Sequence, residues 1–255
     1  MDKNKIEFHQ IGQANKALLF VHGAGSDHSV WDFQIQSLDA DFTLASLNLN
    51  GHGKSPRRDG KELKTYCEDV QIILNELACP TILIGHSMGG AIAMNVALKQ
   101  PDHLIGLGLI STGARLKVID TMLALMDSDF DGAVDFLIGL LFHQSIPDVV
   151  QQTRQMMLNN GQAITLRDFE TCNRFDLRDQ LAQINLPAWI CVGEQDQMTP
   201  VKFSEYLSGA LPKTTLDIIS DAGHMVMLEQ PETFNSKLED WIKKTFSSDH
   251  TSVEA

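Results

Sequence analysis

TILIGHSMGG, residues 81–90, decides the fold of this chain. Its apolar, β-branched start predicts a buried strand, and the residues after Gly90 predict a helix that ends before Pro101. Between the two lies the pattern G-x-S-x-G. Glycines on both sides of Ser87 permit a sharp strand-to-helix turn in which the serine is held in a strained backbone conformation. Such a turn presents the Ser87 hydroxyl above the sheet, as an attacking serine requires.

Two backbone N–H groups are predicted to face the same point. The N–H of Met88 lies at the positive end of the helix that follows Ser87. The second is expected at Ala24, because the turn His22-Gly23-Ala24-Gly25 carries little side chain and lets the backbone approach a ligand closely. Ala24 and Met88 are therefore the predicted donors of an oxyanion hole. The alternative is a harmless serine in a glycine-rich turn, because a five-residue pattern also occurs by chance.

Strands and helices alternate along the first part of the chain. Apolar, β-branched segments predict strands at 5–11, 17–21, 42–47, 81–84 and 104–110, and apolar residues at helical spacing predict helices at 27–38, 62–78 and after Gly90. Alternation of this kind predicts an α/β fold with a mostly parallel, doubly wound sheet. The functional loops of such a sheet follow the carboxyl ends of its strands.

From residue 113 to about residue 181 the alternation stops. Four helices are predicted in succession, at 116–126, 132–142, 147–160 and 165–173, with Ser145 and Thr165 as capping signals and Gly161 as a helix stop. An all-helical insertion after a sheet strand is most simply a cap over the strand ends. The expected organisation is a core of residues 1–112 and 182–246, a helical cap of residues 113–181, and a polar, disordered tail of residues 247–255.

Two later loops supply the groups that an attacking serine needs. The predicted strand 186–192 leads to Asp196, and the predicted strand 214–219 leads to His224. A serine nucleophile needs a base to take its proton, and a histidine base needs a carboxylate to fix its tautomer. Asp221, three residues before His224, is the alternative acid, but a well-aimed hydrogen bond from the same loop is not expected.

The order Ser87, Asp196, His224 is the one found in α/β-hydrolases, and the sequence resembles that family from about residue 6 to residue 246. The motifs that carry the resemblance are His22-Gly23-Ala24-Gly25, Gly51-His52-Gly53-Lys54-Ser55, Gly85-His86-Ser87-Met88-Gly89, Gly193-Glu194-Gln195-Asp196 and Gly223-His224. One departure is Asn48, where many members carry Asp. The resemblance implies kinship with small capped esterases, lactonases and carbon–carbon bond hydrolases, and the serine at position 87 excludes members with an Asp nucleophile.

The sequence therefore predicts a serine hydrolase for carboxylic esters of small to medium acyl chains. In this hypothesis Ser87 attacks, His224 moves the proton, Asp196 orients His224, and an acyl-enzyme forms without any cofactor. A lactonase or carbon–carbon bond hydrolase with the same residues is the alternative within the family. A receptor that binds a small ligand without turnover is the alternative of another class, because a fold alone does not determine function.

Composition limits the partners. The 255 residues carry a net charge of −13, which argues against nucleic acids and anionic membranes as partners. The start of the sequence lacks a signal-peptide pattern, and the four cysteines are scattered, so we expect reduced thiols in a cytoplasmic monomer or homodimer. No metal-ligand spacing is evident. The ending Gly53-Lys54-Ser55 resembles that of a phosphate-binding loop, but Asn48 stands where that loop needs a glycine.

Overall fold

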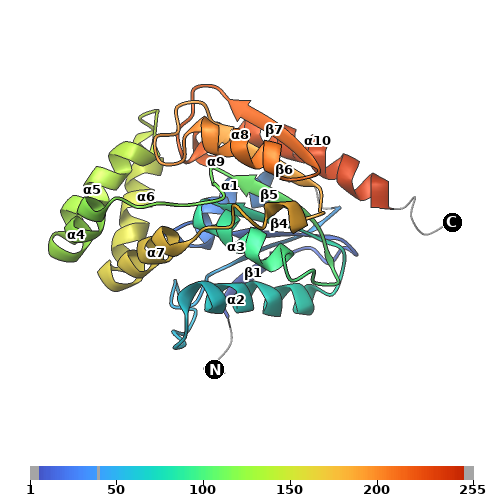
Figure 1. Cartoon of the computed structure of the whole chain (residues 1–255), viewed down its shortest axis with the longest axis horizontal. Coiled ribbons are helices and arrows are strands. Elements are labelled where there is room, and N and C mark those ends of the chain that lie inside the picture. Colours follow the sequence, from blue (N-terminus) through green and yellow to red (C-terminus); the bar gives the residue numbers. More distant parts are fainter. Residues whose placement is uncertain (1–5, 39–40, 250–255) are drawn as a thin grey trace.

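The centre of the molecule is a mostly parallel sheet, shown in Figure 1 for the computed structural model, which describes residues 6–38 and 41–249. Its strands are β1 (Phe8–Ile11), β2 (Ala17–Val21), β3 (Thr43–Leu47), β4 (Thr81–His86), β5 (Leu104–Ile110), β6 (Ala188–Gly193) and β7 (Thr214–Ile219). They lie in the order β1-β3-β2-β4-β5-β6-β7, and only β1 runs antiparallel to its neighbour. The predicted α/β fold with a doubly wound, mostly parallel sheet is confirmed.

Helices cover both faces of the sheet because both faces of its strands are apolar. In β2, Leu19 and Val21 belong to one core and Leu18 and Phe20 to the other, as the alternation of side chains along a strand requires. The first core is covered by α2 (Glu62–Leu77), α3 (Met88–Ala97) and α8 (Val201–Ala210). The second is covered by α1 (Asp32–Ser37), α9 (Val226–Glu229) and α10 (Pro231–Asp249). Two short 3-10 turns, η1 (His28–Trp31) and η2 (Leu181–Gln183), complete the core.

A helical insertion lies between β5 and β6. It consists of α4 (Asp120–Ser128), α5 (Phe130–Leu141), α6 (Pro147–Asn160) and α7 (Gln162–Arg174), which lie together at one side of the molecule in Figure 1. The four predicted cap helices are therefore present. The division into a core of residues 1–112 and 182–246 and a cap of residues 113–181 stays a prediction. None of the helices among the described residues is long and apolar enough to cross a membrane.

The first cap helix starts later than the sequence indicated. Residue 116 was the expected start, but α4 begins at Asp120. The backbone before it is held in an extended conformation, because Arg115 forms an antiparallel bridge with Asp176 and the N–H of Leu177 donates to the carbonyl of Ala114 at 2.8 Å. Pairing with a distant segment thus replaces the first predicted helical turn.

The two predicted capping residues of the insertion were wrong. Helix α6 begins with Pro147 as its first residue and has no side-chain cap, so Ser145 lies outside it. Gly161 ends α6, as predicted, with φ +82, and α7 starts directly after it, so Thr165 lies inside α7. At the other end of the chain, α10 continues to Asp249, past the expected start of the tail at 247, and residues 250–255 lie outside the described residues.

Candidate active site

Ser87 lies in a sharp turn between β4 and α3, with φ +52 and ψ −112. A side-chain carbon placed on Gly85 would lie 2.2 Å from the carbonyl oxygen of Gly89, and one placed on Gly89 would lie 2.4 Å from that of Val21. Neither position has room for any residue except glycine, which agrees with the explanation drawn from the sequence. The backbone conformation of Ser87 is one that serine rarely adopts, and such strain is concentrated at functional sites.

His224 and Asp196 meet beyond the ends of β6 and β7. The Nδ1 atom of His224 lies 2.9 Å from Oδ2 and 3.1 Å from Oδ1 of Asp196. Burial alone would raise the pKa of Asp196, but the charge and hydrogen bond of His224, with bonds from Thr199, outweigh burial and lower this pKa below its ordinary value. Asp221 is exposed, and its carbonyl oxygen accepts hydrogen bonds from Gln144 and Gln230. The carboxylate at the His224 ring is therefore that of Asp196.

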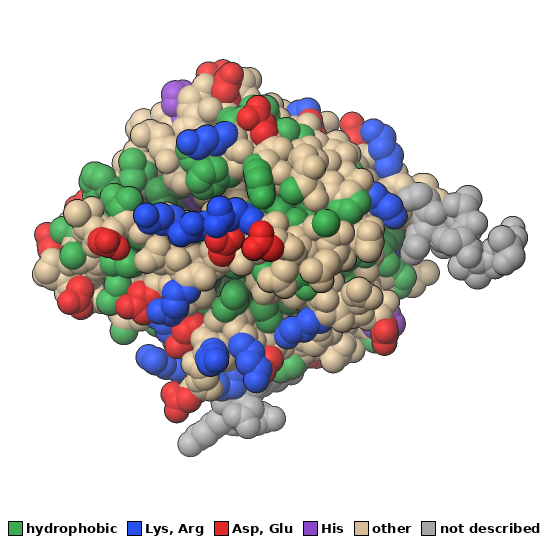
Figure 2. Space-filling view, in the orientation of Figure 1, with side chains coloured by type: hydrophobic (Ala, Val, Ile, Leu, Met, Phe, Trp, Pro, Cys, Tyr) green, Lys and Arg blue, Asp and Glu red, His purple; other side chains and the backbone are tan. Residues whose placement is uncertain are grey.

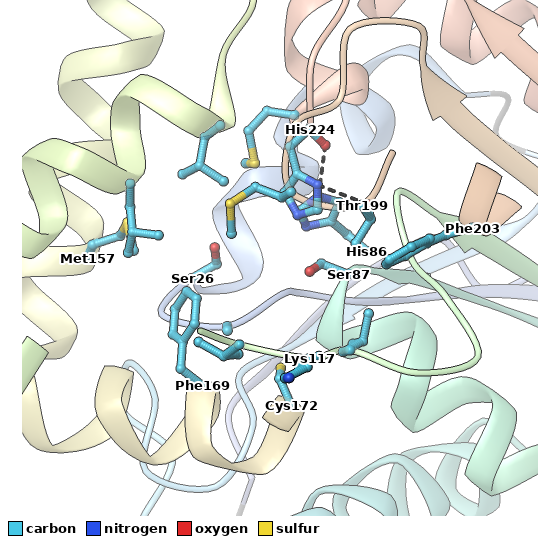
Figure 3. Close-up of a pocket in the computed structure, with 17 residues that line it drawn as sticks. Ser26, His86, Ser87, Lys117, Met157, Phe169, Cys172, Thr199, Phe203 and His224 are labelled. Atoms are coloured by element: carbon cyan, nitrogen blue, oxygen red, sulfur yellow. Dashed lines mark hydrogen bonds between the residues drawn. The ribbon is translucent and has the colours of Figure 1, made fainter. Parts of the chain in front are cut away.

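Ser87 and His224 open onto one cavity between the sheet and the cap. The space between its walls, including the part open to solvent, is about 650 Å³. Its apolar wall comes from the cap helices and includes Leu137, Leu141, Met157 and Phe169. Figure 3 shows the hydroxyl groups of Ser87 and Ser26 directed into this space.

The two predicted N–H donors come from two separate segments of the chain. Met88 is the first residue of α3, and Ala24 lines the cavity from the loop after β2. Within residues 6–38 and 41–249, no acceptor takes a hydrogen bond from the N–H of either residue. Both groups are thus free to bind an oxygen atom.

Three residues that sequence reasoning missed, Met198, Thr199 and Ser26, belong to this site. The backbone N–H and hydroxyl groups of Thr199 donate to Asp196, each at 2.8 Å, and the N–H of Met198 also donates to Asp196 at 2.8 Å. A threonine three residues after a carboxylate can reach back to it, and this spacing was the available signal. Ser26, which lines the cavity, directly follows the His22–Gly25 turn.

His86 holds the backbone of His224. Its Nε2 atom donates to the carbonyl oxygen of His224 at 3.0 Å, and burial lowers the pKa of His86 to about 3. A ring that stays neutral across the physiological range can serve as a fixed hydrogen-bond donor. These contacts give His86 a structural role at the site.

A buried carboxylate of the cap holds the loop that contains Ala24. Asp168, on α7, accepts a hydrogen bond from the N–H of Gly25 at 2.9 Å, from Nε2 of His52 at 2.8 Å and from the hydroxyl of Tyr66 at 2.5 Å. Burial would raise the pKa of Asp168, but His52 and these hydrogen bonds outweigh it and lower the pKa. His52 therefore has a structural role.

A second cap residue holds the same loop. The side-chain amide of Asn160, the last residue of α6, donates to the carbonyl oxygens of Gly25 and Ser26 at 3.0 and 2.9 Å. We call the set Asn160, Asp168, Gly25 and Ser26 the cap clamp. Sequence reasoning missed Asn160 and Asp168, because a helical pattern does not reveal which loop a helix packs against.

Other kinds of site, namely a metal site, a disulfide and a phosphate-binding loop, were also compared with the described residues. Within residues 6–38 and 41–249, no group of three or more His, Cys, Asp or Glu side chains is placed to hold a metal ion. The four cysteines are free thiols. The hydroxyl of Ser55, at the end of the supposed phosphate-binding loop, donates to the carbonyl of Asn48 at 2.6 Å and accepts from the N–H of Glu7. This loop is therefore stabilised by its own hydrogen bonds.

The fold and the site together define a class of protein. A serine at a strand-to-helix elbow, with a histidine–aspartate pair on the loops after two later parallel strands, is typical of α/β hydrolases. Residues 18–237 match the model of the Alpha/beta hydrolase family. The chain belongs to that family.

The proteins similar to this chain include esterases and a receptor. A pimeloyl-[acyl-carrier protein] methyl ester esterase from Serratia marcescens is 27% identical over 91% of this chain and 96% of its own length. The karrikin insensitive 2 receptor IA from Petunia hybrida is 28% identical over 90% of this chain and 91% of its own length. Among solved structures, a thermophilic esterase from Thermogutta terrifontis has a TM-score of 0.84, 26% identity, and coverage of 94% of this chain and 93% of its own.

Proposed function

We propose that this protein is a serine hydrolase that cleaves carboxylic esters of small to medium acyl chains. The observation that carries the proposal is that the strained Ser87 opens onto the same cavity as His224, whose Nδ1 atom lies 2.9 Å from the Asp196 carboxylate. The nucleophile, its base and the group that orients the base are thereby held on three loops at one edge of the sheet.

The first half of the reaction acylates the serine. Nε2 of His224 takes the proton of the Ser87 hydroxyl as its oxygen attacks the ester carbonyl, and the negative oxygen that forms binds to the N–H groups of Ala24 and Met88. The tetrahedral intermediate then collapses. The alcohol leaves with the proton carried by His224, and Ser87 remains esterified.

The second half releases the acid. His224 takes a proton from a water molecule, whose oxygen attacks the acyl-enzyme, and then returns that proton to the oxygen of Ser87. Asp196 keeps Nδ1 of His224 protonated and offsets the positive charge of the ring in both halves. The cycle consumes one ester and one water molecule, produces an acid and an alcohol, and needs no cofactor.

Two of the similar proteins are esterases, which supports this proposal. One is a receptor, which supports a second candidate function. A receptor would bind a small ligand in the cavity without releasing products. A fluorophosphonate probe, read by intact-protein mass spectrometry, tests both ideas together with a turnover assay. An adduct on Ser87 with multiple turnovers supports the hydrolase, whereas absence of both would leave the receptor. Lactones and vinylogous diketones, assayed in parallel, identify the bond that is cleaved.

The cavity predicts a preference for short to medium acyl chains. Each methylene that covers the apolar wall of Leu137, Leu141, Met157 and Phe169 should add about 0.8 kcal/mol of binding free energy until the wall ends. We therefore expect kcat/KM for p-nitrophenyl esters to rise over the first few carbons from acetate and then to fall towards palmitate. A maximum at palmitate, or a jump in rate above the solubility limit of the substrate, would contradict an acyl pocket that ends at this wall.

The cap clamp predicts that cap residues control the catalytic rate. Asp168→Asn and Asn160→Ala should each lower kcat by about 10- to 100-fold with little change in KM, because a displaced Gly25 moves the neighbouring Ala24 N–H away from the oxyanion. Affinity for a boronic acid that mimics the tetrahedral intermediate should fall in parallel. The measurement is steady-state kinetics at matched folded fraction, verified by melting temperature.

Asp135→Asn is the matched control for the clamp variants. Asp135 lies on cap helix α5 and pairs with Arg154 on the surface, so the substitution removes the same charge from the cap without touching the loop. Its kinetics should equal those of the wild type. An increase in KM with unchanged kcat in both clamp variants would show that the cap shapes only substrate binding.

A further inference from the structure

A hollow whose wall includes four basic residues adjoins the active-site cavity. Its wall contains Arg115, Lys117, Arg178 and Lys202, together with the rings of Phe203 and Tyr206. Lys117 and Phe203 also line the active-site cavity, so the two spaces meet at these residues. Figure 2 shows a row of Lys and Arg side chains across this face of the molecule, between the positions of α8 and α7 in Figure 1.

This cluster is positively charged, whereas the chain as a whole is negatively charged. The protein has 20 Lys and Arg against 33 Asp and Glu, yet four cations and no acid line this hollow. Asp176 pairs with Arg178 at 2.6 Å and lies 3.8 Å from Arg115, and Asp179 also attracts Arg178, so these acids act on the two arginines. A local positive region attracts anions even when the protein as a whole is acidic. Its charge has little effect on a neutral substrate.

Two of the four cations have no acidic partner. Within the part of the chain that the structure describes, neither Lys117 nor Lys202 forms a salt bridge. Lys202 lies near the Phe203 ring, with its Nζ atom 5.9 Å from the ring centre. An ammonium group with no carboxylate beside it can pair with an anion of a ligand without losing an existing ion pair.

The position of the hollow indicates which part of an ester it meets. Met157 and Phe169 lie on the cap side of Ser87 in Figure 3, where the apolar wall suits an acyl chain. Phe203 lies on the opposite side of Ser87 from Met157 and Phe169, and it lines both the cavity and the hollow, whereas Lys117 lies below Ser87 beside Cys172. A substrate with its acyl chain under the cap therefore has a path for its alcohol part past Phe203 into the hollow.

We propose that this hollow is a subsite for a carboxylate or phosphate group on the alcohol part of the ester substrate. The proposal rests on the proposed esterase function and adds the class of substrate. The aromatic rings and the alkyl stems of the lysines and arginines supply apolar contact for the alcohol, and the ammonium and guanidinium groups pair with its anion.

The test compares butyrate esters that differ only in charge. The neutral ester is methyl 4-(butyryloxy)benzoate, and the anionic esters are 4-(butyryloxy)benzoate and 4-(butyryloxy)phenyl phosphate. Because their phenols differ in intrinsic leaving ability, the quantity measured is the anionic-to-neutral ratio of kcat/KM, compared between wild type and variant. Lys117→Gln and Lys202→Gln should each lower this ratio by about 2- to 5-fold, and the double variant by about 10-fold. The anionic ester with the larger decrease identifies the preferred head group.

Salt and a control variant complete the test. In 1 M salt, where screening acts over about 3 Å, the ratio should fall in the wild type and change little in the double variant. Lys213→Gln removes the same charge before β7, at the opposite edge of the sheet, and should leave the ratio unchanged. An equal decrease in Lys213→Gln, or an unchanged ratio in the double variant, would overturn the subsite.

Failure of the subsite and failure of the esterase can be told apart. Hydrolysis of the neutral ester with an unchanged ratio in the double variant would leave the esterase standing and remove the subsite. If no ester is hydrolysed, isothermal titration of the wild type with 4-(butyryloxy)benzoate and its methyl ester decides the question. Tighter binding of the anion, lost in the double variant, would support the subsite without the esterase, and equal binding would overturn it.

Discussion

Ser87→Ala is expected to abolish ester turnover, with residual kcat below about one part in a thousand of the wild type. The hydroxyl is the only group removed, and alanine tolerates the φ +52 turn no worse than serine does. The fold should therefore survive, with a melting temperature close to that of the wild type. The fluorophosphonate adduct should disappear together with turnover.

A control variant, purified in the same way, shows how much of any residual activity comes from contaminating esterases. Ser128→Ala removes a hydroxyl that donates to the carbonyl of Ala124 on the surface of the cap, and it should retain full activity when purified in parallel. Turnover by the Ser87 variant at more than about a thousandth of that of the control would place the nucleophile elsewhere.

Asp196→Asn is expected to lower kcat by about 10⁴-fold, for a reason that the hydrogen bonds make explicit. The N–H groups of Met198 and Thr199 both donate to Oδ1, so the amide oxygen of an asparagine takes that position. The amide NH₂ then occupies the position of Oδ2 and donates to Nδ1 of His224. The proton of the neutral ring moves to Nε2, which can no longer take the proton of Ser87.

Asp221→Asn is the control, because Asp221 is exposed and the carboxylate that bonds the His224 ring is that of Asp196. It should retain nearly full kcat. Steady-state kinetics of both variants, with nuclear magnetic resonance of the ring nitrogens to assign the tautomer, checks the prediction. A larger loss in Asp221→Asn than in Asp196→Asn would show that the acid was assigned wrongly.

The elements that sequence reasoning located well are those with local causes. The elbow needs Gly85 and Gly89 because any side chain there meets a backbone oxygen, and this need is visible in five consecutive residues. The cap helices α5 and α6 lie close to their expected ranges because their apolar residues recur at helical spacing. The start of α4 was misplaced because a bridge between Arg115 and Asp176, far apart in the chain, holds that segment extended.

The sequence by itself determined the fold class, the order of the strands along the chain, and the residues proposed as nucleophile and base, Ser87 and His224. These depend on periodicity, on glycine at sharp turns and on strand ends that a parallel sheet brings to one edge. Only the tertiary structure decided that Asp196, and not Asp221, bonds His224. It alone showed that Asn160 and Asp168 of the cap hold the loop beside Ala24, and that Lys117 and Lys202 line one hollow. Those contacts join residues that are far apart in the chain. Side-chain packing between helices determines which of these residues meet, and no local sequence pattern encodes that packing.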